Sequence, residues 1–578
     1  MSKKIFLLAV ILIIASFFRL YQINQTPPGL YPDEAMNGNN ALQALRTAPP
    51  AGGFKVFYPE NAGREGLFIN IQAFFLNLFK VNEPWVLRLP SAIFGVLTVL
   101  GVYFLTKELF GENLKSQAPN SKQIQNSKPF GNWKLEIGNY EVALLSSFLM
   151  ATSFWHINFS RIGFRAIMAP FFLTWTLYFL LYALKKAETL TDSIKIFIPA
   201  AIGGIFYGLG FYSYIAYRAT PLLIFIILLI YWLKNKNSIL KTSDALNTDN
   251  RNFRTSDVRK LIRKKILLVA FFFSLIALIV FTPLGLYFLQ NPQDFFGRTS
   301  QISIFNSSAP LKNLGLNILK TAGMFNFVGD GNWRHNYAGK PELFWPVGIL
   351  FVIGVILGIA RLFKAPSTKH QIPNNDQNSK EFGNWNLFGI GNLGFVILFS
   401  WLIIAALPVV ISNEGLPHAL RAILMIPPVF ILAAIGGFWF YKFLKTKIRP
   451  ATLKVFTIIF CGFLIFETLN TYFILWAKNP NVYNAFNSNY LELAKKLNEL
   501  PKELPKYVIV EAGGMTVPMK SAFYADEDKI VNVPMPAQTI MFITDTFDFQ
   551  KQKEKNIFYV LPEKINRIPE NSFTIELK

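Results

Sequence analysis

Long apolar stretches recur along the whole chain and constrain its fold more than any other feature. Stretches of about 18–25 apolar residues have the length that a helix needs to cross a hydrocarbon layer of roughly 30 Å. Hydrophobic residues make up 52% of the 578 positions and charged residues only 16%, an apolar excess beyond what a water-soluble core requires. We therefore predict an all-α polytopic membrane protein. About 11 spans are expected, near residues 4–22, 84–106, 140–159, 166–184, 194–213, 219–233, 265–289, 343–363, 393–411, 421–443 and 453–476.

The distribution of basic residues predicts the orientation in the membrane. Segment 234–265 carries ten Lys and Arg residues, whereas segment 23–66 carries three. Because basic loops stay in the cytoplasm, the N-terminus is expected inside the cell and the first loop outside. The first apolar run lacks a small-residue cleavage site, so we interpret it as a retained span rather than a signal peptide.

The same topology predicts the domain organisation. A transmembrane domain covers residues 1–476, with external loops at 23–83 and 290–342 and cytoplasmic insertions at 112–139 and 365–392. The segments 126–135 and 378–387 agree at eight of ten positions, and both fall in these polar insertions. An odd number of spans leaves residues 477–578 outside the cell.

Residues 477–578 alternate helix-like and strand-like pieces, which predicts a small external α/β domain. The helix-like piece is YLELAKKLNEL, and the pieces YVIVEA, SAFYA, IMFITD and NIFYVL follow it. A glycine-rich phosphate loop and a nucleophile elbow are both missing from this sequence. We therefore assign the domain to substrate or partner contact rather than to chemistry.

Two function classes are disfavoured by charge and cysteine content. The formal net charge is +23, but the basic residues lie mostly between apolar segments instead of on an aromatic-rich face, so nucleic acid is not an expected partner. The single cysteine, Cys461, lies in an apolar stretch and can build neither a disulfide nor a cysteine metal site.

The adjacent carboxylates Asp33 and Glu34 follow the first span by about a dozen residues and are the strongest candidates for chemistry. The preceding PPGLYP cannot continue a helix, whereas the following residues have helical character with apolar positions at three-to-four spacing. Asp33 is thus expected to cap a short helix on the membrane surface, and capping alone would explain its presence. Catalysis and capping are compatible.

Basic residues predicted on the same external face favour a catalytic role for Asp33. Each of them could be an ordinary interface anchor, but together with the carboxylate pair they indicate a site for an anionic lipid head group. The candidate phosphate-binding residues are Arg64, Arg88, Arg165, Arg218, His418 and Arg421, and Arg161 lies in the same external turn as Arg165.

A lipid-linked phosphate sugar fits this arrangement, because its tail stays in the bilayer and its phosphate lies at headgroup depth. Asp33 can accept the proton of an acceptor hydroxyl or amine as it attacks the anomeric carbon, while arginines offset charge on the departing phosphate. One base suffices for such an inverting displacement. Glu34 would point elsewhere from the helix start and is given an orienting role.

These residues resemble glycosyltransferase superfamily C (GT-C), in the branch of the protein O-mannosyltransferases and lipid A aminoarabinose transferases. The resemblance spans roughly residues 1–445 and is carried by PDEA, the AFFLNLF pattern after Gly63, WVLRLPSAIFGVLTVLGVYFLTKELFG and HALRAILMIPP. It implies that Asp33 is the catalytic base and that Arg64 occupies the place of the family's basic residue before the surface helix. It also implies a polyprenyl-phosphate sugar donor and an extracytoplasmic acceptor, which could be a protein, a glycan or a lipid.

One departure from the family concerns the start of the fourth span. Many relatives carry a second acidic residue there, whereas this chain reads RIGFRAIMAP. Related oligosaccharyltransferases bind a divalent ion through several carboxylates, but Asp294, Asp330 and Glu342 are scattered here, so we expect no required metal.

Two other functions stay open. A lipid or glycolipid transporter or flippase is the main alternative, although the spans contain no matching pair of broken helices in two halves. A non-catalytic receptor or scaffold would depend on residues 477–578 and not on Asp33.

Overall fold

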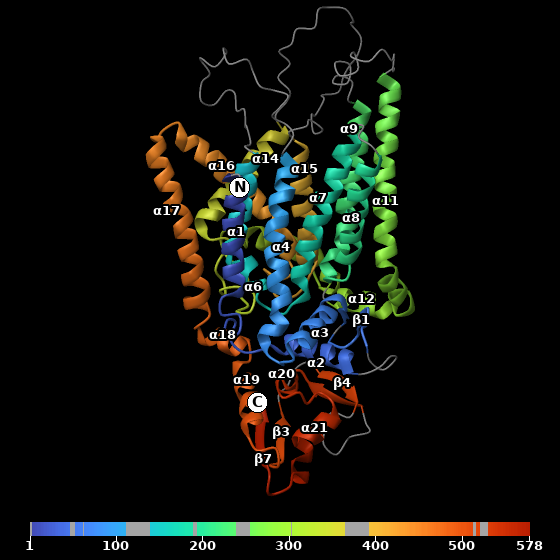
Figure 1. The fold of residues 1–578 in the computed structure, drawn as a ribbon, viewed down its shortest axis with the longest axis vertical. Helices are drawn as coiled ribbons and strands as arrows, with labels where there is room; N and C mark the ends of the chain where they lie inside the picture. Colours follow the sequence, from blue (N-terminus) through green and yellow to red (C-terminus); the bar gives the residue numbers. More distant parts are fainter. Residues whose placement is uncertain are drawn as a thin grey trace, which may run out of the picture.

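The protein is a long helical bundle with a small α/β unit at one end, as the computed structural model shows (Figure 1). The N-terminus lies near the opposite end of the bundle from this unit. The near-identical segments 126–135 and 378–387 lie outside the described residues. The structure describes residues 3–46, 53–61, 63–110, 139–188, 193–237, 255–301, 303–363, 392–511, 516–520 and 530–577.

Within these residues, eight helices are long and apolar enough to cross a membrane. Each coincides with one of the predicted spans, which confirms the polytopic helical class. They are α4 (Pro84–Phe110), η1 with α7 (Arg165–Ile167, Met168–Glu188), η2 with α9 (Ile215–Ala219, Thr220–Asn237), α11 (Thr255–Gln290), α14 (Trp345–Phe363), α15 (Leu393–Val410), η4 with α16 (Ile423–Met425, Ile426–Lys445) and α17 with the π-helical η5 (Pro450–Thr468, Leu469–Trp476).

The other three predicted spans are helical but shorter or more charged. Helix α1 (Lys3–Leu20) contains three basic residues, and α8 (Ser193–Gly210) is apolar only over Ile194–Gly210. The predicted span 140–159 is divided into α5 (Asn139–Ala151) and α6 (Phe154–Phe159). The division falls at Ser153, whose hydroxyl accepts the His156 N–H and begins a new helix.

Small residues allow the central helices to approach closely. A Cβ added at Gly354 of α14 would lie 1.9 Å from the Leu432 carbonyl oxygen of α16, and one at Gly436 would lie 2.0 Å from the Leu350 oxygen. Such contacts compensate for the weak hydrophobic drive between helices in lipid. The two helices therefore pack in close contact at these glycines.

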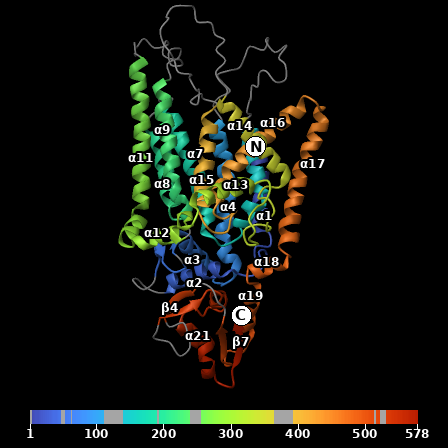
Figure 2. The same cartoon turned by 180° about the vertical axis from the view of Figure 1, so that it is seen from behind.

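Short elements lie across the end of the bundle that faces the α/β unit (Figures 1 and 2). The AFFLNLF pattern after Gly63 lies in α3, a helix of 13 residues. These elements are α2 (Pro32–Arg46), β1 (Phe57–Tyr58), β2 (Arg64–Glu65), α3 (Leu67–Phe79) and α12 (Pro292–Gln301). Between α12 and α14, the chain also forms η3 (Ile304–Asn306) and α13 (Pro310–Gly323).

The residues after 477 form the predicted mixture of helices and strands. Three strands form a parallel sheet in the order β6-β3-β7, and β4 pairs with β5 antiparallel. YVIVEA and NIFYVL contribute β3 and β6, whereas the strand-like IMFITD is helical in α20, and SAFYA lies outside the described residues. The elements are α18 (Pro480–Ala485), α19 (Ser488–Glu499), β3 (Lys506–Val510), β4 (Thr516–Lys520), β5 (Ile530–Pro534), α20 (Ala537–Ile543), α21 (Phe549–Lys555), β6 (Ile557–Val560), η6 (Pro562–Arg567) and β7 (Phe573–Leu577).

Candidate active site

Asp33 lies in the first turn of α2, at the end of the bundle beside the α/β unit (Figure 1). The expectation that it caps this helix is wrong: α2 begins at Pro32, and the Glu34 and Ala35 N–H groups donate to the Tyr31 carbonyl. Proline is favoured at the first position of a helix, because an N–H group at that position has no hydrogen-bond partner within the helix. The Asp33 carboxylate is partly exposed, and the Asn61 amide donates to it at 3.0 Å. It is thus held in place while open on one side.

Glu34 points away from Asp33 into a fully buried ion pair with Arg88. The Arg88 guanidinium lies 3.0 Å from the Glu34 carboxylate and donates to the carbonyls of Pro27 and Gly29 at 2.7 and 2.8 Å. The Gly163 N–H donates to the other Glu34 oxygen at 2.8 Å. Both side chains have 0% exposure, so Arg88 joins the loop before Asp33 to α4 instead of facing a ligand.

Arg165 and Arg218 converge on Glu65 of β2. The Arg165 Nε lies 2.8 Å from one Glu65 oxygen and an Arg218 nitrogen lies 3.4 Å from the other. Glu65 is almost completely buried, whereas the two arginine side chains are 22% and 18% exposed. The pair therefore presents two guanidiniums at the edge of the site, with only one carboxylate between them.

Arg64 adjoins this pair, and its pKa is affected by the charge of Asp33. Burial, which is the largest effect, lowers the pKa of Arg64 to about 10, although the negative charges of Glu60 and Asp33 act in the opposite direction. Its guanidinium donates to the side-chain oxygens of Asn37 and Asn40 on α2. Arg64 therefore connects the Glu65 group to the helix that carries Asp33.

The remaining two predicted ligands, His418 and Arg421, belong to a separate group before α16. Arg421 is buried and donates to the Glu414 carbonyl at 2.9 Å and to its carboxylate at 2.8 Å. The His418 Nδ1 lies 3.8 Å from Asp330 Oδ2. Burial first, and then the charges of His335 and Arg421, lower the pKa of His418 to about 3, so this imidazole is neutral.

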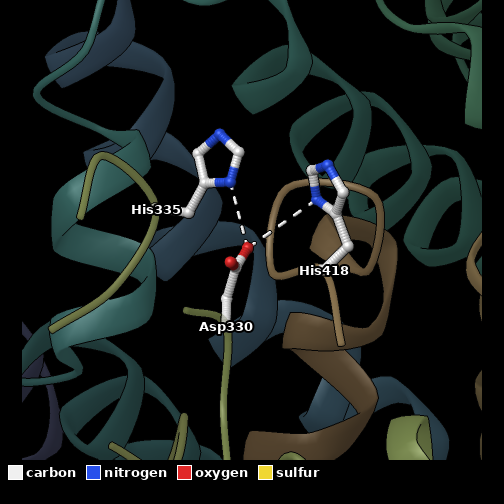
Figure 3. Close-up of side chains that lie close together, drawn as sticks. All are labelled: Asp330, His335 and His418. Carbon is white, nitrogen blue, oxygen red and sulfur yellow. Dashed lines mark hydrogen bonds and ion pairs between the residues drawn. The ribbon is translucent and has the colours of Figure 1, made fainter. Parts of the chain in front are cut away.

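Asp330 and Glu342 are not scattered, contrary to the expectation from the sequence. The Asp330 N–H donates to Glu342 Oε1 at 2.9 Å, and the Asp330 carboxylate accepts from His335 at 3.0 Å. Figure 3 shows Asp330 between the two histidines. Only Asp294 stands apart, bound to the Tyr287 hydroxyl at 2.7 Å. Asp330, His335 and His418 form a group that could hold a metal, whereas the sequence had predicted no required metal.

Arg334 connects the two groups and was missed from the sequence. Its guanidinium lies 3.8 Å from the centre of the Tyr31 ring, two residues before Asp33. Burial and the charge of Asp33 raise the pKa of the Tyr31 hydroxyl, and Arg334 counteracts this. The segment GDGNWRHNY contains Asp, Arg and His within a few residues, and this pattern could have identified Arg334 from the sequence.

The α/β unit packs directly on the back of α2. Phe542 of α20 lies against Gly38, where an added Cβ would be 2.5 Å from its ring, and the Thr539 hydroxyl donates to the Leu30 carbonyl at 2.9 Å. Asn39 donates to the Gln538 side chain at 2.9 Å. The unit therefore supports the helix that carries Asp33.

Gly38→Val is expected to lower the free energy of unfolding by about 1–3 kcal/mol, because the added carbons meet the Phe542 ring. Thermal unfolding in detergent measures the effect. Gly315→Val is the matched control, since nothing lies within 4 Å of a Cβ at that helical glycine. In a protein that already carries Phe542→Ala, Gly38→Val should lower the free energy of unfolding by less, because the Phe542 ring is gone. If Gly38→Val causes the same loss in wild type and in the Phe542→Ala protein, this contact is contradicted.

Comparisons with known proteins give structural likenesses at low sequence identity. No protein-family model matches the chain, and no curated protein does. The chain is similar to ArnT from Cupriavidus metallidurans bound to undecaprenyl phosphate, with TM-score 0.47, 11% identity, and coverage of 99% of this chain and 89% of the other.

Two further likenesses involve larger proteins. The Archaeoglobus fulgidus oligosaccharyltransferase gives TM-score 0.46 and 13% identity over 88% of this chain, which spans only 62% of that enzyme. The S. cerevisiae protein O-mannosyltransferase Pmt1-Pmt2 complex gives 0.34 and 17% over 51% of this chain and 34% of the other. All three likenesses are at identities of 17% or less. The function proposed below rests on the chain's own residues.

Proposed function

We propose that this protein is a membrane glycosyltransferase that moves a sugar from a polyprenyl-phosphate donor to an acceptor outside the cytoplasm. The observation that carries the proposal is the partly exposed Asp33 carboxylate, held by Asn61 beside a group of arginines at one end of a membrane-spanning bundle. A base and a set of phosphate-binding cations in one place are what transfer from a lipid phosphate needs.

Each step has a group to perform it. Asp33 accepts the proton of the acceptor hydroxyl or amine while the acceptor attacks the anomeric carbon, and the bond from that carbon to the phosphate oxygen breaks. Polyprenyl phosphate leaves with the electron pair, and the anomeric centre is inverted. Arg165 and Arg218, at the exposed edge, offset the charge on the phosphate, and Arg64 contributes from behind them.

The other predicted ligands take different roles in this proposal. Arg88 and Glu34 position the loop before Asp33, because their charges are fully buried against each other. Arg421 forms an ion pair with Glu414, and His418 lies beside Asp330. Both residues therefore belong to the group before α16 and not to the group around Glu65. We therefore place the phosphate at Arg165 and Arg218.

The experiment that tests the function offers purified protein a panel of polyprenyl-phosphate sugars with protein, glycan and lipid acceptors. Sugar transfer that needs both donor and acceptor is the expected result. A flippase would instead move the labelled lipid between leaflets of proteoliposomes without consuming it. That outcome, with no donor in the panel used, would contradict the proposal.

Arg165→Ala is expected to raise the donor KM by about 10- to 100-fold, because a charge-assisted hydrogen bond to phosphate contributes about 1.5–3 kcal/mol. The melting temperature should fall less than for a fully buried arginine, because the Arg165 side chain is 22% exposed and Arg218 still faces Glu65 after the change. Steady-state kinetics at varied donor concentration measures the effect.

Arg161→Ala is the matched comparison, because Arg161 is fully buried and donates to the carbonyls of Phe18, Tyr21 and Thr26. It should lower stability more than donor binding. If Arg165→Ala behaves like Arg161→Ala, the edge arginines are structural and the phosphate lies elsewhere.

A further inference from the structure

We propose that Asp330, His335 and His418 bind one divalent transition-metal ion, with zinc as the ion that best fits their donors, and that this ion joins two external loops. Both imidazoles turn Nδ1 toward the same carboxylate oxygen, Asp330 Oδ2 (Figure 3). Two imidazole nitrogens and one carboxylate oxygen form a set that suits zinc and leaves a fourth position open.

The spacing of the three donor atoms fits a metal. Ligands about 2.1 Å from a tetrahedral zinc ion lie about 3.4 Å from one another. The Asp330 oxygen lies 3.0 Å from His335 Nδ1 and 3.8 Å from His418 Nδ1, and all three donor atoms lie within 4.8 Å of each other. Small side-chain rotations would bring them around one ion.

The hydrogen bonds at His418 favour a cation between the donors. The Arg421 N–H donates to His418 Nδ1 at 3.4 Å, so that nitrogen carries a lone pair. The same nitrogen faces an Asp330 oxygen that is itself an acceptor, which leaves two lone pairs opposed at 3.8 Å. A metal ion in this position would coordinate both groups, whereas without it the contact is unfavourable.

The surrounding groups orient the carboxylate as an outer shell does in metal sites. The Ala419 N–H donates to Asp330 Oδ2 at 2.9 Å, and the Asn332 N–H donates to Oδ1 at 2.8 Å. Both bonds keep the Asp330 carboxylate aimed between the two rings. Asp33 is not a member of this set, so the ion would be distinct from any ion at the catalytic carboxylate.

The consequence for function follows from Arg334, which lies in the sequence between the proposed ligands Asp330 and His335. The ion would fix the loop from Asp330 to His335 against the segment before α16. That loop carries the guanidinium that stacks on Tyr31, next to Asp33. Metal binding itself does not depend on the transfer reaction, but this positioning effect rests on the proposed function.

The test measures metal content and stability before activity. Detergent-purified protein is stripped with a chelator, dialysed against Zn²⁺ and analysed by elemental spectrometry. Wild type should hold about one zinc per chain, as a single three-ligand site would. Asp330→Asn and His418→Gln should each weaken zinc binding by more than about 100-fold, beyond the 10- to 100-fold typical of outer-shell changes. Zinc should raise the melting temperature of wild type but not of these variants.

Two carboxylate variants serve as controls. Asp294→Asn removes a carboxylate from the same external loop, where it binds Tyr287, and should keep full zinc binding. Asp33→Asn should also keep it while losing transfer, which separates this proposal from the proposed function. Cobalt gives a readout without variants, because a Co²⁺ ion bound to this site absorbs visible light and is displaced by zinc.

Wild type that takes up no more zinc than Asp330→Asn, or that shows no zinc-displaceable cobalt absorption, would overturn the proposal. The three residues would then be an ordinary hydrogen-bonded group. If Asp330→Asn does not fold, the comparison with His418→Gln and the cobalt measurement still decide between these outcomes.

Discussion

Replacing Asp33 with asparagine is expected to lower the rate of sugar transfer by about 10²- to 10⁴-fold, the usual contribution of a general base. The amide has the same shape and its oxygen can still accept from Asn61, but it cannot take up the acceptor's proton. Stability should be nearly unchanged, because the carboxylate is partly exposed and outside the buried ion pairs. Turnover at saturating donor and acceptor, together with the melting temperature, measures both effects.

Asp294→Asn is the matched control for this change, because it removes a carboxylate of α12 that is bound to Tyr287. It should transfer sugar at the wild-type rate. Wild-type turnover by Asp33→Asn at equal protein amounts would show that another group accepts the proton. A parallel loss of turnover and melting temperature would show that Asp33 is needed for the fold.

The spans could be predicted from sequence because lipid imposes a simple rule: every buried backbone group must be bonded within its own helix. Hydropathy and length therefore predicted the first residue of α4, Pro84, and placed the end of α11 within one residue of Gln290. The break between α5 and α6 was missed, because it depends on the single hydroxyl of Ser153 and not on composition. IMFITD shows the same limit, since short apolar runs fit a helix or a strand equally well.

The candidate site was predicted only in part, because side-chain pairing depends on tertiary contacts. Glu34 and Arg88 are 54 residues apart in the sequence, and nothing in either motif shows that they neutralise each other. The exposure of each arginine side chain also depends on tertiary packing: Arg165 is 22% exposed, whereas Arg88 is fully buried. The sequence therefore predicted a set of cations on one face but not which of them are buried in ion pairs.

The loop from Asp330 to His335 gives the clearest example of information that the sequence did contain. Asp330, Arg334 and His335 lie within six residues of a polar segment, but only Asp330 was considered from the sequence, as one of three scattered carboxylates. Their partner His418 had been assigned to the phosphate instead. A search for mixed donors, not carboxylates alone, would have brought these residues together.

The buried pair of Glu34 and Arg88 gives the second large expected effect, this time on stability. Arg88→Met is expected to lower the free energy of unfolding by about 3–5 kcal/mol, because it leaves the Glu34 charge buried without a partner. The carbonyls of Pro27 and Gly29 also lose their donor. Glu34→Gln should cost less, since the amide oxygen can still accept from the Gly163 N–H.

Unfolding by heat or by denaturant, in detergent, measures these losses of stability. The donor KM is determined on the fraction of protein that stays folded. Arg165→Ala is the comparison, because its ion pair with Glu65 is partly exposed and should contribute less to stability. The two assignments of Arg88 then give opposite results. A positioning residue loses stability with little change in donor KM, because its guanidinium never reaches the phosphate. If Arg88→Met is as stable as wild type and only donor KM rises, Arg88 binds the phosphate and the bundle must open there to admit it.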